Sequence, residues 1–168
     1  MTTLLLVRHG ETVDNVRQIM QGQTQGELNE KGIVQAREVS MKLKDDPIDV
    51  FISSDLKRSM DTCRMIAEPH GKEMITTPLL RERDWGSFTG CFIPDLKDRE
   101  WTDDIETMGQ MKERARRFLE FVRKSFPGKR VLAVGHGIIN KAVLSVYYGK
   151  PMHEIQKMEN AEIRILQI

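Results

Sequence analysis

The feature that most constrains the fold is a run of four apolar residues, Leu4 to Val7, near the beginning of the chain. A run this short, flanked by polar residues, is typical of a strand buried on both faces, as in a parallel sheet covered by helices. Arg8, His9 and Gly10 follow it directly. Because ligands of open α/β sheets bind beyond the carboxyl ends of the strands, a small anion can be held by these three residues.

Strand and helix patterns alternate along the rest of the chain. Short apolar runs predict further strands at 48–52, 74–80, 130–134 and 161–168. Apolar residues at helical spacing, with caps and breakers at their ends, predict helices at 14–20, 30–43, 55–68, 105–122 and 139–148. The segment 81–104 has no clean period and is expected to be irregular, and Pro78 suits an edge strand. This order predicts an α/β fold, a three-layer α/β/α sandwich with a mostly parallel central sheet, formed by one domain over 1–168.

Charge and composition exclude several classes of partner. The 26 basic and 25 acidic residues give a formal net charge of +1, which offers no general attraction to nucleic acid or to an anionic membrane. The first apolar run is too short for a membrane span or a signal segment, so a cytoplasmic location is expected. Cys63 and Cys91 form neither a CxxC motif nor a disulfide framework, and Cys63 is interpreted as a core residue.

Four polar residues lie just after predicted strands: His9, Arg58, Glu82 and His136. Because the carboxyl ends of parallel strands lie at one edge of a sheet, these residues are expected to come together there. His9 and His136 each precede a glycine, which removes side-chain bulk where a ligand would approach. Arg58, in the first turn of a helix, combines a guanidinium with free N–H groups and the positive end of the helix dipole. This chemistry indicates a phosphoryl group as the ligand.

Each of these residues also has a purely structural interpretation. A lone Arg-His-Gly triplet is a weak signal, and a single histidine at a strand end is more often a hydrogen-bonded structural residue. Arg58 can pair with Asp55 or Asp61, and Glu82, between two arginines, can belong to a solvated run of charges. The coincidence of several strand-end residues with matching chemistry favours the functional interpretation.

Five motifs carry a resemblance to a known family. They are Arg8 to Thr12 with Asn15 and the Gln21-Gly22 loop, Leu28 with Gly32 and Ala36, Ser53 to Ser59 with Thr62, Leu80 to Gly86 with Gly90, and His136-Gly137. In this order and approximate spacing, over nearly the whole chain, they resemble the histidine phosphatase superfamily. This family includes the cofactor-dependent phosphoglycerate mutases and their phosphatase relatives.

The resemblance implies a phosphomonoester hydrolase that needs neither a metal nor a cofactor. His9 is then the nucleophile and becomes a transient phosphohistidine, with its other ring nitrogen bound to a backbone carbonyl. Arg8, Arg58 and His136 surround the phosphoryl oxygens and stabilise the charge of the transition state. Glu82 protonates the leaving oxygen and afterwards activates water.

Further residues are implied to bind the substrate, a phosphorylated small molecule. Asn15 and the backbone amides around Gln21, Gly22 and Gly137 would add neutral hydrogen bonds to the phosphate. Thr12 either belongs to this group or only supports it. Trp85 and Phe88 would form an apolar wall beside Glu82 or belong to the core, while Phe92, Trp101 and Met108 are placed at the substrate end. The identity of the substrate and the oligomeric state stay open.

Departures from the family pattern favour a phosphatase over a mutase. The interval between Glu82 and His136 is shorter than the corresponding insertion in the mutases, and a smaller lid admits more water. The region Cys91 to Asp104 is rich in acidic residues, a poor wall for a doubly phosphorylated cofactor. Ile138 stands where the mutases have a polar residue. Arg116-Arg117 resembles a basic pair of the mutases but lies on a helix whose exposed face would be basic anyway.

Three alternatives remain beside the phosphatase. One is a phosphoglycerate mutase, and another is a binding module that kept the pocket and lost turnover. A metal-dependent phosphoesterase is the third, although no close spacing of histidine and carboxylate ligands supports it. The remaining histidines, His70 and His153, are interpreted as surface structure.

Overall fold

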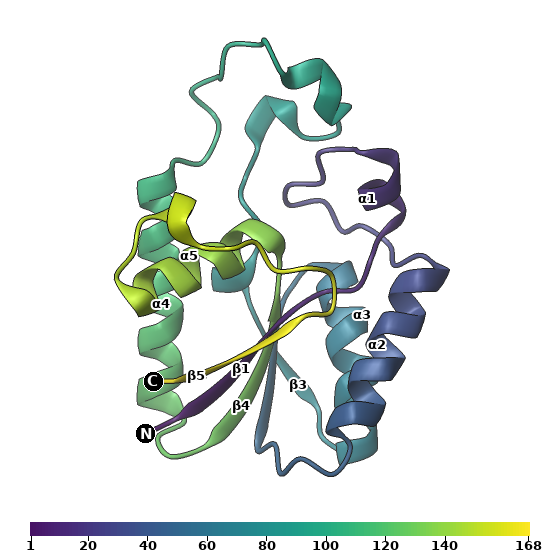
Figure 1. Ribbon diagram of the computed structural model, residues 1–168, viewed down its shortest axis with the longest axis vertical. Coiled ribbons are helices and arrows are strands. Elements are labelled where there is room, and N and C mark those ends of the chain that lie inside the picture. The colour runs from purple at the N-terminus through teal and green to yellow at the C-terminus, as the bar shows by residue number, and fades with distance from the viewer.

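Five strands form a single sheet in the order β3-β2-β4-β1-β5 in the computed structural model, which describes residues 1–168 (Figure 1). The strands are β1 (Thr3–Arg8), β2 (Val50–Ser54), β3 (Met74–Thr77), β4 (Arg130–Gly135) and β5 (Ile163–Gln167). The first four run parallel, and β5 pairs with β1 in the antiparallel direction. The predicted α/β fold with a mostly parallel sheet is confirmed.

Strand β1 lies inside the sheet, between β4 and β5, and its four apolar residues are fully buried, as expected. Leu4 and Leu6 pack into the core on one face, and Leu5 and Val7 into the core on the other, because successive side chains of a strand alternate between faces. The predicted strand at 74–80 is an edge strand but stops at Thr77. There Pro78, which has no N–H for the ladder, begins a 3₁₀ turn over Pro78–Leu80.

Helices cover both faces of the sheet and complete the three layers (Figure 1). On one face, α2 (Glu30–Leu43) and α3 (Lys57–Ala67) pack over a core that includes Cys63, which confirms the buried role of this cysteine. On the other face, α4 (Met108–Ser125) and α5 (Gly137–Tyr148) pack over the larger core. The short helix α1 (Val13–Arg17) follows β1.

Two helices begin later than the sequence predicts, for different reasons. The predicted cap Ser53–Asp55 does not cap α3, which begins after Leu56, because the Asp55 carboxylate binds the Arg81 guanidinium at 2.6 and 2.7 Å. Helix α4 begins at Met108 rather than at 105, because Thr107 forms a capping box with Gln110. The same helix runs on past the predicted end to Ser125.

The segment 81–104 contains only short 3₁₀ turns, which confirms its predicted irregular structure, and it arches over the carboxyl edge of the sheet (Figure 1). Its residues Trp85, Phe88 and Leu96 form a small core together with Ile105, the next residue of the chain. Backbone hydrogen bonds join it to the residues after α1, including Met20 N–H to Cys91 O at 2.9 Å and Ile93 N–H to Gln18 O at 2.8 Å. We call this segment the lid.

Glycines let α2 approach the turn that follows β1. A Cβ atom on Gly32 would lie 2.0 Å from the Glu11 carbonyl oxygen, and one on Gly10 would lie 2.5 Å from the Gly32 carbonyl oxygen. Both distances are far below van der Waals contact, so only glycine fits at either position. This close contact fixes the backbone around His9 against the helix.

Candidate active site

The rings of His9 and His136 meet edge to face at the carboxyl ends of β1 and β4, with their centroids 5.0 Å apart. Both side chains are buried, with 2% and 0% of their surface exposed. They come together because β1 and β4 are neighbours in the parallel sheet, with Arg8 paired to Gly135.

The surroundings of His9 keep its imidazole neutral. Its Nδ1 lies 2.7 Å from the carbonyl oxygen of Gly10, which accepts the Nδ1 proton and leaves Nε2 unprotonated. Burial, reinforced by the nearby Arg58 guanidinium, lowers the pKa of His9 to about 3. An unprotonated, neutral imidazole nitrogen is a competent nucleophile at neutral pH.

Arg58 is held by the loop that follows α1, and not by the acidic residues near it in the sequence. Its guanidinium donates to the carbonyl oxygens of Thr24 and Gly22, the latter at 2.8 Å. Gly26 has a φ of +71°, and a Cβ atom there would lie 2.8 Å from Arg58 Cδ. Burial lowers the pKa of Arg58 to about 10, so the group stays charged at neutral pH.

The proposed ion-pair interpretation of Arg58 is wrong. Asp55 binds Arg81, and Asp61 binds Lys57 at 2.8 Å and Arg64 at 3.0 Å, so neither carboxylate faces Arg58. A charged side chain with 1% of its surface exposed therefore has only neutral carbonyl partners.

Three buried nitrogen atoms around His9 have no hydrogen-bond partner: Arg8 Nε, Arg58 Nε and His136 Nδ1. The other atoms of these side chains are held in place, since Arg8 Nη1 donates to Met158 O at 2.7 Å and His136 Nε2 contacts Ser54 Oγ at 2.7 Å. When the Ser54 hydroxyl donates to Nε2, Nδ1 carries the ring proton and is a donor. Buried donors are almost always satisfied in folded proteins, so this set calls for an acceptor.

Glu82 lies at the amino-terminal end of α5. Its Oε1 accepts hydrogen bonds from the N–H groups of Arg83 at 2.9 Å and Ile139 at 3.1 Å, and its Oε2 accepts one from Ile138 at 3.1 Å. Three backbone donors and the positive end of the helix dipole stabilise a carboxylate. These three contacts fix the position of the Glu82 carboxyl group.

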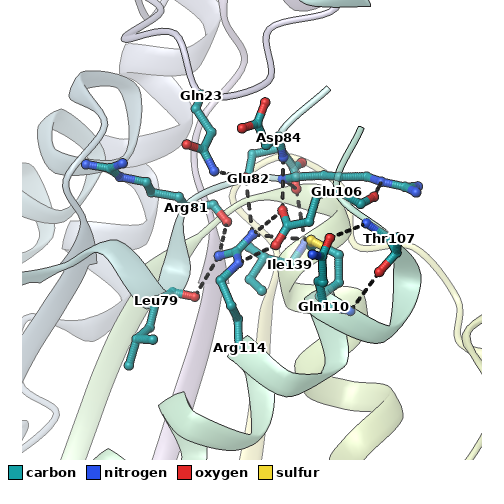
Figure 2. Close-up of polar contacts among 12 residues, drawn as sticks. Gln23, Leu79, Arg81, Glu82, Asp84, Glu106, Thr107, Gln110, Arg114 and Ile139 are labelled. Carbon is teal, nitrogen blue, oxygen red and sulfur yellow. Dashed lines mark hydrogen bonds and ion pairs between the residues drawn. The ribbon is translucent and has the colours of Figure 1, made fainter. Parts of the chain in front are cut away.

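Arg114 of α4 holds the segment that carries Glu82 (Figure 2). It donates to the carbonyl oxygens of Leu79 at 3.0 Å, Arg81 at 2.9 Å and Glu82 at 3.3 Å, and it pairs with Glu106 at 2.7 Å. Arg114 is not among the residues that the sequence motifs single out. The available signal is its place on the buried side of the predicted helix, three positions after the buried Met111 and four before the buried Phe118.

A cavity of about 120 Å³ lies beside these groups, and His136, which contacts the ring of His9, is not part of its lining. Its lining is formed by Arg8, His9, Asn15, Ile19, Met20, Gln21, Gly22, Arg58, Glu82, Trp85, Ile93, Gly137, Ile138 and Lys157. This is small beside the few hundred Å³ of a typical ligand pocket, and it suits a phosphoryl group with few further atoms.

The predicted binding residues divide into two groups. Asn15, Gln21, Gly22 and Gly137 line the cavity, although the Gly22 carbonyl, and not its amide, meets Arg58. Thr12 does not line the cavity. It caps α1, and its hydroxyl donates to Gln21 Oε1 at 3.0 Å, so it supports the loop.

Two residues near the carboxyl end of the chain reach the site without any signal in the sequence. Lys157 lines the cavity, and Asn160 Nδ2 donates to the carbonyl oxygen of His9 at 3.1 Å. Among the aromatic residues, Trp85 lines the cavity, whereas Phe92 and Trp101 do not. Met108, also expected at the substrate end, is the first residue of α4 and does not line the cavity. Trp101 is 59% exposed and packs against Trp85, with ring centroids 5.3 Å apart.

The whole chain contains neither a metal-binding cluster of side chains nor a helix that could span a membrane. Nowhere do three or more histidine, cysteine, aspartate or glutamate side chains gather in a way that could hold a metal ion. None of the helices has the length and apolar character needed to span a membrane.

The comparisons with known sequences point to one family. The sequence model of the histidine phosphatase superfamily (branch 1) matches residues 4–168. The chain is 34% identical to an uncharacterized phosphatase, PhoE, of Bacillus subtilis over 96% of this chain and 86% of the relative. It is 36% identical to a metal-independent phosphoserine phosphatase of Arabidopsis thaliana, over 84% of this chain and 67% of that relative. It is 31% identical to a probable phosphoglycerate mutase, GpmB, of Yersinia pestis, over 94% of this chain and 80% of that relative.

Solved structures agree with this assignment. A mycobacterial glucosyl-3-phosphoglycerate phosphatase is 25% identical, with a TM-score of 0.90 over 98% of this chain and 92% of the other. A phosphoserine phosphatase of Entamoeba histolytica, bound to phosphoserine, is also 25% identical. Its TM-score is 0.88, over 98% of this chain and 90% of the other. The chain therefore belongs to the histidine phosphatase superfamily, branch 1.

Proposed function

We propose that this protein is a metal-independent phosphomonoester hydrolase that works through a phosphohistidine on His9. The observation that carries the proposal is the set of three unpartnered, buried nitrogen atoms on Arg8, Arg58 and His136, next to a neutral imidazole. Two guanidinium groups and an imidazole N–H match the charge and the acceptor oxygens of a phosphoryl group.

The first step transfers the phosphoryl group to the enzyme. Nε2 of His9 attacks phosphorus as the bond between phosphorus and the leaving oxygen breaks, and the leaving oxygen takes a proton from Glu82. Glu82 must hold this proton before the bond to the leaving oxygen breaks.

The second step regenerates the enzyme. Glu82, again a carboxylate, takes a proton from a water molecule that attacks the phosphorus of the phosphohistidine. The bond between phosphorus and Nε2 breaks, and inorganic phosphate leaves. The three backbone donors that stabilise the carboxylate of Glu82 favour this base role.

Hydrolysis is better supported than mutase activity. Beyond the phosphoryl donors, much of the cavity wall is apolar: Ile19, Met20, Trp85, Ile93 and Ile138. Arg116 and Arg117 do not line the cavity, and Arg116 is an exposed residue that pairs with Glu113. Beyond the phosphoryl donors, a second phosphate of a bisphosphorylated cofactor would find Lys157 as its only cationic partner in the cavity wall. The similarity to a probable phosphoglycerate mutase keeps that activity as the second candidate.

The substrate is proposed to be a small phosphorylated metabolite. The cavity of about 120 Å³ leaves room for few atoms beside the phosphoryl group. Similar structures include one in complex with phosphoserine and one in complex with 3-phosphoglyceric acid, which are compounds of suitable size.

The test is hydrolysis of an aryl phosphate in the presence of EDTA by the wild type and by His9→Ala, with His153→Ala as the control for an exposed histidine. The wild type and the control are expected to be active, and His9→Ala to lose about 10³-fold or more in kcat. A neutral or alkaline quench should trap an acid-labile phosphoenzyme in the wild type only.

Other outcomes would point elsewhere. Activity that EDTA abolishes and added metal restores would contradict a metal-independent mechanism, and activity that persists in His9→Ala would exclude His9 as the nucleophile. Phosphoglycerate interconversion that requires bisphosphoglycerate and exceeds hydrolysis would identify a mutase. Binding of phosphate esters without any phosphoenzyme would identify a binding module.

A further inference from the structure

Lys157 is the one cation of the cavity that the phosphoryl chemistry does not use. The cavity is lined by three cationic residues, Arg8, Arg58 and Lys157, and by one carboxylate, Glu82. Arg8 and Arg58 each offer an unpartnered buried Nε to the phosphoryl group. Lys157 comes from the loop before β5 and leaves its ammonium for another task.

The backbone on both sides of Lys157 is anchored to the site. Ile155 and Met158 are buried, and the Met158 carbonyl accepts a hydrogen bond from Arg8 at 2.7 Å. Asn160 donates to the carbonyl oxygen of His9 at 3.1 Å. These contacts fix the position of the lysine backbone relative to the nucleophile, so its side chain enters the cavity mouth from a defined point.

The ammonium of Lys157 has no acidic partner within ion-pair distance. Its side chain and that of Arg8 meet over Gly137, where a Cβ atom would lie 3.3 Å from Lys157 Cε and 3.4 Å from Arg8 Cζ. Burial, together with the charge of Arg8, lowers the pKa of Lys157. Glu82 and Glu159 are near enough to act in the opposite direction, but neither forms an ion pair with Lys157. Two converging cations of which one has no ion-pair partner favour an anion from the ligand.

We propose that Lys157 binds a carboxylate of the substrate, so that the enzyme prefers phosphate esters of hydroxy acids or hydroxy amino acids. The cavity of about 120 Å³ requires the second anion to lie within a few bonds of phosphorus. A single ammonium matches the single charge of a carboxylate. When Glu82 carries the proton for the leaving oxygen, the three positive charges balance a phosphoryl dianion and one carboxylate. This inference rests on the proposed hydrolase function.

The test compares matched pairs of substrates that differ only in the carboxylate: phosphoserine with phosphoethanolamine, and 3-phosphoglycerate with glycerol 3-phosphate. Lys157→Met keeps the length and apolar character of the side chain, Lys157→Arg keeps the charge, and Lys150→Met is the control for an exposed lysine away from the cavity. We expect Lys157→Met to lower kcat/KM for the carboxylated substrates by about 10- to 100-fold, mainly through KM. For the substrates without a carboxylate, kcat/KM should change by about twofold at most.

Lys157→Arg should restore part of the lost preference, and inhibition by inorganic phosphate should be equal in the wild type and Lys157→Met. An equal loss on both members of each pair, or weaker inhibition by phosphate, would assign Lys157 to the phosphoryl group and overturn the inference. The inference would also be overturned if the wild type hydrolysed both members of each pair equally well. That result would leave the proposed hydrolase function intact.

Binding separates this inference from a failure of the proposed function. Calorimetry with the His9→Ala protein measures affinity for phosphoserine and phosphoethanolamine without any turnover. Suppose that the wild type hydrolyses neither compound. The carboxylate site is still supported if His9→Ala binds phosphoserine more tightly than phosphoethanolamine and if the double variant with Lys157→Met loses this preference. If His9→Ala binds the two compounds equally well, the inference is overturned.

Discussion

At the scale of single residues, the two buried imidazoles at the strand ends control the response to pH. Burial, together with the charge of Arg58, lowers the pKa of both His9 and His136, to about 3 for His9. In the unfolded chain the same groups titrate near their ordinary value of about 6.5. The native state therefore excludes protons that the unfolded state accepts below that pH.

This difference predicts that acid destabilises the protein below about pH 6.5. Because the unfolded state binds more protons below about pH 6.5, the free energy of unfolding should fall by up to about 1.4 kcal/mol per pH unit for each histidine as the pH is lowered. Above about pH 6.5 these two histidines should not affect the free energy of unfolding. Urea unfolding between about pH 5.5 and 7.5 tests this, a range in which carboxylates contribute little. His9→Gln should show about half the slope of the wild type, and an unchanged slope would refute the assignment.

At the scale of elements, the position of Glu82 depends on a contact between α4 and the segment that follows β3. Arg114 binds three carbonyl oxygens of residues 79–82 and the Glu106 carboxylate, as Figure 2 shows. Glu106 in turn accepts a hydrogen bond from the N–H of Asp84 at 3.0 Å. One partly buried ion pair thus fixes the backbone on both sides of the proposed acid and base.

We expect Arg114→Met to weaken proton transfer by Glu82 more than it weakens attack by His9. Its kcat should fall by about 10²-fold for alkyl phosphates, whose leaving oxygen needs a proton, and much less for p-nitrophenyl phosphate, whose leaving group does not. Loss of this partly buried pair and its charged hydrogen bonds should also cost about 2 kcal/mol of stability. Arg116→Met, on the same helix but exposed, is the control, and an equal loss of kcat on both kinds of ester would leave Arg114 with a purely structural role.

At the scale of the whole molecule, the lid closes the cavity from the side opposite the sheet. Its small core and its hydrogen bonds to residues 18–20 hold it over the carboxyl edge, where Ile93 and Trp85 line the cavity. A larger cavity of about 630 Å³ lies beyond the Glu82 segment, but its wall includes five carboxylates, which repel a phosphate: Asp84, Asp103, Asp104, Glu106 and Glu113. Substrate size is therefore limited by the lid.

Shortening a lid side chain should relax this limit. Ile93→Ala removes apolar bulk from the cavity wall, so kcat/KM for naphthyl phosphate should rise several-fold relative to that for a small alkyl phosphate. Ile165→Ala, at an exposed position on β5, is the control and should leave the ratio unchanged. If the ratio is also unchanged in Ile93→Ala, lid opening, and not the width of the cavity, sets access.

The same lid shows where prediction from the sequence stopped. Its irregular character could be predicted, because glycines, prolines and the lack of a period are local properties. Its path could not, because it depends on which residues Trp85 and Phe88 pack against and on pairing with residues 18–20. For this reason Phe92 and Trp101 were expected at the substrate end, whereas Ile93 lines the cavity.

The sequence by itself determined the α/β fold and the edge of the sheet at which His9, Arg58, Glu82 and His136 meet. Hydrophobic period encodes strands and helices, and parallel strands joined by helices bring their carboxyl ends to one edge. Only the tertiary structure decided the partner of each polar group: the loop carbonyls on Arg58, the backbone donors on Glu82, and Lys157 in the cavity. Such partners are distant along the chain, and packing in three dimensions, which leaves no local pattern, selects them.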